Sequence, residues 1–174
     1  MGAHDSHAPA SPGPIRSGLR LRPITDGDLP FLRALYGSTR EEELAPVAWT
    51  PEQKEAFLDQ QFHAQHAQYM SAYEHPSFAV VEVDGEPAGR LYVDRRPTEL
   101  LVVDIAFLPA FRGRGIGTLL LEGLIAEAEA TSIPVTMHVE RNNPVIRLYA
   151  RLGFRLVEDR GVYLFIARQP APGG

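Results

Sequence analysis

The segment of the chain best suited to chemistry is a glycine-rich turn, Arg112-Gly113-Arg114-Gly115-Ile116-Gly117-Thr118, which stands between an apolar stretch and an amphipathic one. Where a loop enters a helix, backbone N–H groups without helical partners face outward along a favourable dipole. Glycines let an anion approach that backbone closely. The turn is therefore suited to hold an anion such as a phosphate. The alternative is a glycine-rich helix start that binds nothing.

Two common phosphate-binding motifs do not fit this turn. A dinucleotide fingerprint requires glycine at its sixth position, which is Thr118 when counted from Gly113 and Leu120 when counted from Gly115. A P-loop requires Gly-Lys-Ser/Thr, and the only lysine in the chain is Lys54. The turn does contain the pattern Arg-x-x-Gly-x-Gly, from Arg112 to Gly117.

A second motif follows later in the chain, where Asn142-Asn143-Pro144 is followed by Leu148-Tyr149 and then by Gly153-Phe154. In this order the two motifs resemble those of the GNAT N-acyltransferase superfamily, with Val145 where that family usually has alanine. The resemblance rests on the stretch from Leu100 to Phe154. It implies a mixed α/β fold and the transfer of an acyl group, usually acetyl, from coenzyme A to a primary amine.

The resemblance also implies how acetyl-CoA would be held. The strand before the turn would pair its free backbone with the pantetheine arm, and the turn would hold the pyrophosphate. No metal is expected, because the chain has no cysteine and its His and Gln residues between positions 60 and 66 lack carboxylate partners. The residues expected to contact the coenzyme are Ile105, Ala106, Phe107, Arg112, Gly113, Arg114, Gly115, Ile116, Gly117, Thr118, Asn142, Asn143 and Tyr149.

Tyr149 is the residue that the resemblance assigns as general acid toward the departing thiolate. The reference pKa of a cysteine thiol is ~8.5 and that of tyrosine is ~10, so full proton transfer would be uphill by about 1.5 units, or ~2 kcal/mol. A hydrogen bond to the developing charge on sulfur is enough to help, and late protonation completes the step. The alternative is a helix tyrosine whose hydroxyl lies at the surface.

The attacking amine must also lose a proton, which costs about 4.6 kcal/mol at pH 7 if its pKa is the ~10.4 of lysine. Leu101 stands where many family members have a glutamate, so another base is needed. His138 and Asp104 are the catalytic candidates. A histidine on a strand is also often structural, and the alternative for Asp104 is a structural salt bridge or hydrogen bond with Arg90, Arg95 or Tyr92.

Acceptor recognition in this fold normally falls to the first helices and their loop, and the residues expected to contact the substrate are Arg40, Glu43, Trp49 and Tyr92. Carboxylates near a pocket attract a cationic amine, although the run from Glu41 to Glu43 is also typical of a solvated helix. A second function class is a non-catalytic coenzyme-A-binding regulatory domain of the same fold. Leu101 favours that alternative, whereas Tyr149 favours the enzyme.

Strand-like and helix-like patterns alternate along the chain in the order β-α-α-β-β-β-α-β-α-β-β. A meander combined with a β-α-β crossover predicts a mixed, mostly antiparallel sheet of six to seven strands with helices on both faces. The expected strands are 19–22, 78–83, 88–93, 100–107, 135–140, 154–158 and 162–167. The expected helices are 25–37, 51–73, 115–130 and 143–152.

Length and composition limit the remaining questions. The chain has 174 residues, with 15 glycines and 15 prolines, and these residues are denser at the two ends than between them. We therefore expect disordered tails over residues 1–18 and 169–174 and a single domain over 19–168. A net charge of −5 suits a cationic substrate and argues against general nucleic-acid binding. No apolar stretch is long enough to span a membrane, so a cytoplasmic protein is expected. The resemblance also implies a homodimer as one oligomeric state, but the sequence identifies no interface.

Overall fold

A computed structural model describes residues 18–173, so the tail expected over residues 1–18 lies, except for Gly18, outside the described residues. The order of elements confirms the expected one. The strands are β1 (Leu19–Pro23), β2 (Pro76–Val83), β3 (Glu86–Arg95), β4 (Leu100–Phe107), β5 (Val135–Glu140), β6 (Arg155–Arg160) and β7 (Tyr163–Arg168). The helices are α1 (Leu29–Leu44), α2 (Pro51–Ala72), α3 (Ile116–Thr131) and α4 (Ile146–Arg151), with short 3-10 turns at Asp26–Asp28 and Pro109–Phe111.

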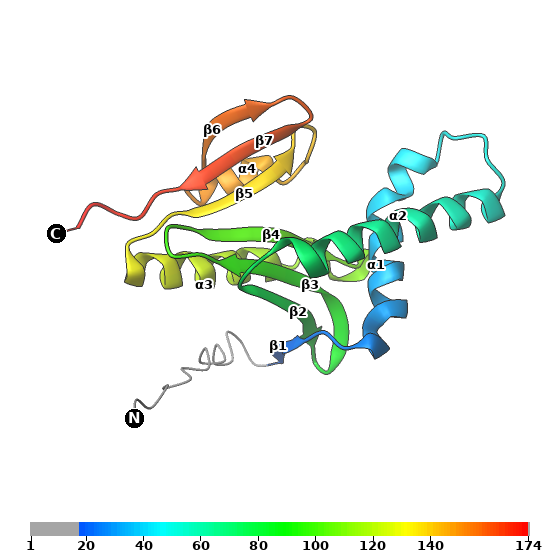
Figure 1. Ribbon diagram of the computed structural model, residues 1–174, viewed down its shortest axis with the longest axis horizontal. Coiled ribbons are helices and arrows are strands. Elements are labelled where there is room, and N and C mark those ends of the chain that lie inside the picture. Colours follow the sequence, from blue (N-terminus) through cyan, green and yellow to red (C-terminus); the bar gives the residue numbers. More distant parts are fainter. Residues whose placement is uncertain (1–17, 174) are drawn as a thin grey trace.

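The strands form one sheet in the order β1-β2-β3-β4-β5-β7-β6, and β4 and β5 are its parallel pair. This confirms the expected mixed, mostly antiparallel sheet. The parallel pairing is short, because it joins only Leu100, Leu101 and Val102 to their partners on β5. Beyond Val102 the two strands diverge, as Figure 1 shows. The sheet is therefore open in the middle, at the carboxyl ends of β4 and β5.

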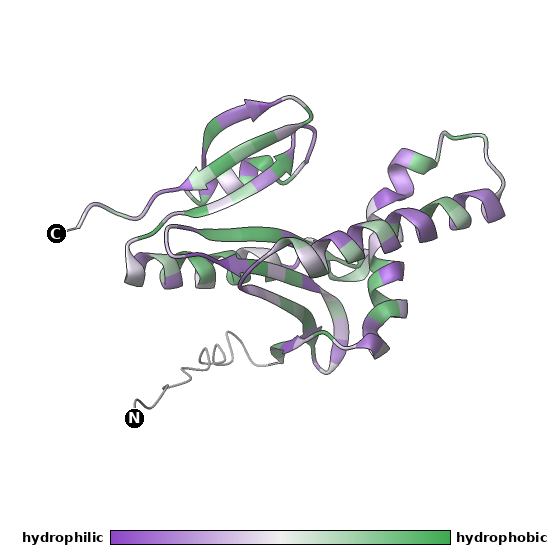
Figure 2. Cartoon of the chain, in the orientation of Figure 1, coloured by the Kyte–Doolittle hydropathy of each residue, from purple (hydrophilic) through white to green (hydrophobic). Residues whose placement is uncertain are grey.

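Helices cover both faces of the sheet. α3 and α4 pack on one face and contribute Leu120, Leu124 and Tyr149 to the main core, together with apolar residues of β3, β4 and β5. α1 and α2 lie on the other face, and α2 crosses in front of β3 and β4 (Figure 1). Figure 2 shows that β4 is mostly apolar, with Asp104 as its one charged residue, whereas α2 is largely hydrophilic. Among the described residues, no helix is both long and apolar enough to cross a bilayer.

The closed end of the diverging strands is fixed by polar contacts. The Thr136 hydroxyl of β5 donates to the Glu99 carboxylate at 2.6 Å, just before β4 begins. Arg96 joins Glu99 (2.9 Å) to Asp94 (2.8 Å), whose carboxylate is almost fully buried. These bonds hold β4 against β5 at one end only, so the opening lies at the other end.

The first helix differs from the expected one. It was expected to end near Gly37, but α1 continues to Leu44. A glycine inside a helix costs about 1 kcal/mol relative to alanine, and the burial of Leu35 and Tyr36, which directly precede Gly37, outweighs this cost. The helix consequently carries Arg40 and Glu43 on its last turns rather than on a loop.

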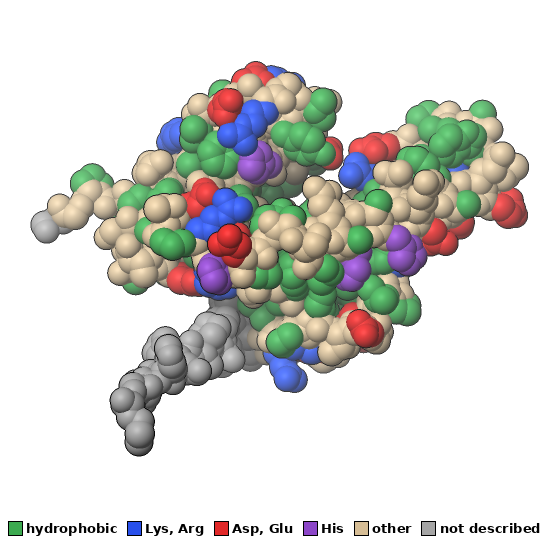
Figure 3. All heavy atoms as spheres, in the orientation of Figure 1, with side chains coloured by type: hydrophobic (Ala, Val, Ile, Leu, Met, Phe, Trp, Pro, Cys, Tyr) green, Lys and Arg blue, Asp and Glu red, His purple; other side chains and the backbone are tan. Residues whose placement is uncertain are grey.

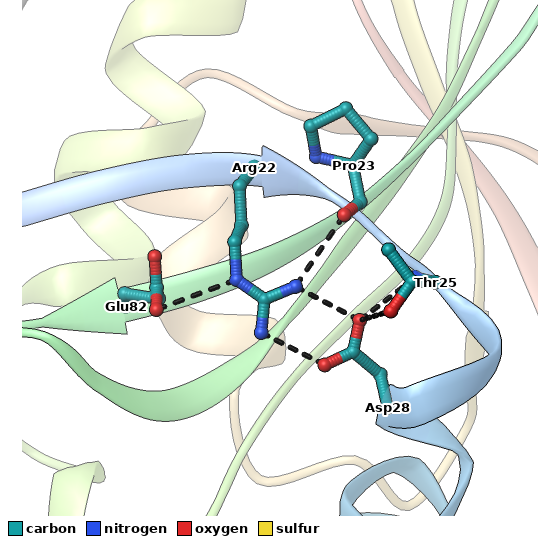
Figure 4. A network of polar contacts seen from close by, with 5 residues as sticks. All are labelled: Arg22, Pro23, Thr25, Asp28 and Glu82. Carbon is teal, nitrogen blue, oxygen red and sulfur yellow. Dashed lines mark hydrogen bonds and ion pairs between the residues drawn. The ribbon is translucent and has the colours of Figure 1, made fainter.

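A polar network fixes the start of α1 to the edge of the sheet (Figure 4). Arg22 of β1 forms a two-pronged ion pair with Asp28, with both nitrogen–oxygen distances at 2.8 Å, and also contacts Glu82 of β2. Asp28 also accepts the backbone N–H of Thr25 at 2.8 Å. The hydrogen bond to Arg22 lowers the pKa of Asp28 to about 2. The bond network sets the direction in which α1 leaves β1.

Candidate active site

The diverging strands leave part of β4 with an unpaired edge. β4 pairs with β3 along its whole length, except for a bulge after Tyr92 that leaves Val103 without a partner. On its other side, β4 pairs with β5 only up to Val102. Ile105, Ala106 and Phe107 thus lie on a stretch whose backbone groups have no β5 partner in residues 18–173. Such an edge can pair with an extended ligand.

The glycine-rich turn stands at the open end of this stretch and leads into α3. Gly113 and Gly115 have φ angles of +70° and +77°, which side chains rarely tolerate, and a Cβ atom added at either would point into open space. The bond from the Leu119 N–H to the Gly115 carbonyl (3.1 Å) is where helical bonding starts. The N–H groups of the residues just before Leu119 therefore face out of the helix start, toward any anion bound there.

The two arginines of the turn are placed differently. The Arg112 Nε donates to the Phe107 carbonyl at 2.9 Å, and its Nη2 donates to the Ser38 hydroxyl at 3.2 Å. It thereby ties the turn to the end of β4 and to α1. Arg114 lies over the Phe111 ring, with its Cζ 5.4 Å from the ring centre, and is exposed to solvent. Arg114 is the better placed of the two to add positive charge at the turn.

Tyr149 is positioned by α4, on the face of the sheet that α3 also covers. Its ring packs edge-on against Phe154, with the ring centres 6.0 Å apart, and only 6% of the residue is exposed. Tyr149 and Val139 of β5 line the same cavity of about 270 Å³. Burial, and secondarily the negative charge of Asp104, raise the pKa of the Tyr149 hydroxyl to about 12. The hydroxyl therefore keeps its proton at any physiological pH.

The two asparagines lie in the turn between β5 and α4. The Asn143 side-chain oxygen accepts the backbone N–H of Val145 at 2.9 Å, and the backbone N–H of Asn143 donates to the Glu140 carbonyl at the same distance. Asn143 thus shapes the approach to α4. Asn142 is exposed.

Asp104 lies where the strands separate, two residues beyond the last residue of β4 that pairs with β5. It faces α2. Its Oδ2 accepts from the Arg90 Nη2 at 2.5 Å and from the Tyr69 hydroxyl at 3.3 Å. The side chain is 18% exposed. Of the three partners expected for Asp104, the structure provides Arg90.

His138 also lies on the sheet face that α1 and α2 share, but it is already engaged. Its Nε2 lies 2.6 Å from the Nη1 of Arg160, and its ring packs against Phe165. Partial burial, followed by the charge of Arg160, lowers the pKa of His138. The ring is therefore neutral at pH 7, with one lone pair directed at Arg160. Leu101 is buried opposite Asp94.

The four residues expected to contact the acceptor do not lie together. The Arg40 guanidinium contacts Glu43 (2.9 Å) and Glu140 (3.5 Å), and so joins α1 to the end of β5. Trp49 lies in the loop between α1 and α2 and packs on Phe57 of α2. This loop projects away from the sheet (Figure 1), and hydrophobic side chains gather at its end (Figure 3). Tyr92 is fully buried and lies behind the site.

Sequence reasoning did not place Arg90 in the interior. Arg90 and Asp104 each interrupt an apolar strand, and the two strands are consecutive in the chain. Two opposite charges on neighbouring apolar strands were the sequence signal for a buried ion pair. The register of the β3–β4 hairpin sets Arg90 opposite Ala106 and Tyr92 opposite Asp104. The positions of Gln65 and Tyr69 over this pair follow from the way α2 crosses the sheet.

Comparisons with known proteins agree with this geometry. A model of the acetyltransferase (GNAT) family matches residues 39–154. The chain belongs to the GNAT acetyltransferase family. No curated protein sequence matches it, whereas many solved structures share its GNAT fold.

Three of the solved structures illustrate the range of GNAT neighbours. PaiA N-acetyltransferase from Thermoplasma acidophilum, in complex with coenzyme A, has a TM-score of 0.65 at 17% identity, covering 87% of this chain and 98% of that one. A GNAT acetyltransferase from Elizabethkingia anophelis with acetyl-CoA bound has a TM-score of 0.57 at 15% identity, covering 88% and 99%. Arabidopsis thaliana Naa50 with the bisubstrate analogue CoA-Ac-MVNAL has a TM-score of 0.54 at 17% identity, covering 86% and 97%. At these identities the likeness is one of fold.

Membership of the GNAT family gives the site a general chemistry, which is acyl transfer from coenzyme A. The unpaired edge of β4, the glycine-rich turn and Tyr149 are arranged around the divergence of β4 and β5.

Proposed function

We propose that this GNAT protein is an acetyl-CoA-dependent N-acetyltransferase that acts on a primary amine of a small molecule or peptide. The amine attacks the thioester directly, with both substrates bound. The observation that carries the proposal is the opening between β4 and β5, with an anion-binding turn at one end and Tyr149 and Asp104 contributed from opposite faces of the sheet.

The residues around the opening fit acetyl-CoA. The free edge of β4 beyond Val102 offers backbone partners for the amides of an extended arm at Ile105 and at the N–H of Phe107, with Ala106 between them paired to β3. The turn from Gly113 to Thr118 offers N–H groups to a pyrophosphate, and its two left-handed glycines leave room for it. When bound, the coenzyme supplies an acetyl group activated as a thioester.

Tyr149 acts in this proposal by donating a hydrogen bond to the sulfur as negative charge develops there. With the pKa of Tyr149 at about 12 and that of a thiol near ~8.5, full proton transfer would be uphill by about 3.5 units, or ~5 kcal/mol. That is more than the ~2 kcal/mol expected from reference values. The hydroxyl therefore stabilises the thiolate without giving up its proton, and water protonates the thiolate after it leaves.

Asp104 is the better placed of the two candidate bases to take the proton of the amine. The Nε2 of His138 is directed at Arg160, which blocks the lone pair that a base would use. Asp104 accepts both of its bonds through Oδ2, so that Oδ1 has no partner within the described residues. We assign proton acceptance to Asp104, and a structural role to His138 through its contacts with Arg160 and Phe165.

The acceptor would approach from the α1–α2 face. Glu43 and Glu140 are paired with Arg40 there, whereas Asp104 keeps one carboxylate oxygen, Oδ1, available to attract a cationic amine. Naa50, a neighbour in fold, is seen with a peptide-containing bisubstrate analogue, which supports a peptide amine as one acceptor class.

The test is a broad screen of amines with acetyl-CoA, in which thiol release is the readout. We expect amine-dependent release by the wild type, greatly slowed release by Tyr149→Phe, and no thermal stabilisation of Gly115→Glu by acetyl-CoA. Buried Leu101, at the usual glutamate position, favours the non-catalytic alternative. Saturable acetyl-CoA binding without thiol release from any amine would establish that alternative.

A further inference from the structure

A single arginine is buried beneath α2. Arg90 of β3 is 3% exposed. Its Nη2 donates to Asp104 at 2.5 Å and to the Gln65 Oε1 of α2 at 2.9 Å. Its Cζ lies 5.0 Å from the centre of the Tyr92 ring and 5.8 Å from that of Tyr69. The guanidinium is thus enclosed by two aromatic rings, one amide and one carboxylate.

Stability alone does not explain this arrangement. Removing two charges from water costs about as much as their attraction returns, and well-packed apolar residues of similar size often stabilise a fold equally well. The cluster is also incompletely satisfied, because the Arg90 Nε and the Tyr92 hydroxyl are buried without hydrogen-bond partners in residues 18–173. The pair consequently calls for a role other than holding the fold together.

The position of the pair suggests that role. Asp104 lies at the point where β4 leaves β5, opposite Tyr92 and beside the bulge at Val103. Arg90 and Tyr69 both bind its Oδ2. Burial, and then the charge of Asp104, raise the pKa of Tyr69, so the tyrosine keeps its proton and remains a donor. One carboxylate oxygen, Oδ2, is therefore fixed by Arg90 of β3 and Tyr69 of α2, and the other, Oδ1, is left for a ligand.

We propose that Asp104 Oδ1 is an ammonium-binding subsite for the acceptor and that Arg90, Tyr69 and Gln65 are positioning residues that orient it. This assignment rests on the proposed function and names the acceptor class, which is an alkylamine that is charged at neutral pH. An arylamine or other neutral amine cannot form an ion pair with the subsite and binds it less strongly. Arg90 acts through Asp104 and contacts no substrate.

The experiment compares two acceptors of similar size, a charged alkylamine and a neutral arylamine. Asp104→Asn should raise the KM for the alkylamine by about 10- to 100-fold, because a charge-assisted hydrogen bond is lost, and should leave the KM for the arylamine essentially unchanged. Arg90→Met should raise the KM for the alkylamine by at least about threefold through misplacement of the carboxylate. Calorimetric titration of the alkylamine into protein with coenzyme A should show the same losses without any turnover.

Two further variants separate positioning from folding. Arg95→Met removes another arginine of β3, whose partner is Glu127 on the surface, and should change neither KM. The double variant Arg90→Met with Asp104→Leu replaces the pair by apolar side chains and should fold, bind coenzyme A and bind the alkylamine as weakly as Asp104→Asn does.

Equal losses for both acceptors, or none, would overturn the assignment of Asp104. Loss of coenzyme A binding in the folded double variant would also overturn it. If the wild type acetylates no amine at all, the proposed function fails instead, and the calorimetric titration still decides whether the alkylamine binds at Asp104.

Discussion

Replacing Tyr149 by phenylalanine isolates the hydroxyl from the rest of the side chain. Tyr149 is only 6% exposed, and the phenylalanine ring keeps the packing on Phe154. The hydroxyl makes no hydrogen bond within the described residues, so its removal should change the free energy of unfolding by less than about 0.5 kcal/mol. The substitution therefore tests chemistry with little change in stability.

The expected kinetic effect follows from a single charge-assisted hydrogen bond. Such a bond contributes about 1.5–3 kcal/mol, so the loss of one that forms only as charge appears on sulfur should lower kcat by about 10- to 150-fold. The KM for either substrate should change little, because the ground state makes no such bond. Stopped-flow or steady-state thiol release, with melting temperature as control, measures both. An unchanged kcat, or a rise in KM that accounts for the whole loss, would refute this role of Tyr149.

Three further predictions follow from the described geometry. Because the pKa of Tyr149 is raised to about 12, kcat for a neutral arylamine, whose own charge does not change at alkaline pH, should show no decline centred near pH 10, and such a decline would be inconsistent with the raised pKa of Tyr149. Gly115→Ala forces a side chain into a left-handed conformation at φ +77° and should destabilise the fold by about 1–2 kcal/mol in denaturant titrations and weaken acetyl-CoA binding in calorimetry, whereas Gly27→Ala, at a glycine of ordinary φ, serves as its control. The pKa of Asp28 is lowered from 3.8 to about 2, so its ion pair stabilises the protein fully above pH 4 and is lost as the pH falls toward 2. Allowing for solvent screening of Arg22, Asp28→Asn should cost about 1 kcal/mol at neutral pH and flatten the acid limb of stability in that window, and an unaltered acid limb would exclude the contribution.

The sequence allowed the framework of the site to be predicted closely. β4 and β5 have the expected bounds. Each is rich in β-branched residues and lies close to a proline, Pro109 after β4 and Pro134 before β5. The start of α2 was also foreseeable, since Thr50 and Gln53 form a capping box with bonds of 3.2 Å and 2.9 Å. These features depend on residues that are neighbours in the chain.

Features that depend on packing between distant segments could not be predicted. The length of α1 depends on burial of its central turn, which offsets the cost of Gly37. The enclosure of Arg90 depends on the register of β3 with β4 and on where α2 crosses them. The separation of β4 from β5 after Val102 depends on contacts at the other end, through Thr136 and Glu99. None of these is a local pattern.

The central claim is that the opening between β4 and β5 binds acetyl-CoA and delivers its acetyl group to an amine. Mass spectrometry of a reaction with isotopically labelled acetyl-CoA and a panel of alkylamines tests it most directly. We predict an N-acetylated amine that carries the label, formed in step with thiol release and slowed in Tyr149→Phe. Acetyl-CoA that binds but yields no labelled product with any amine would contradict the claim.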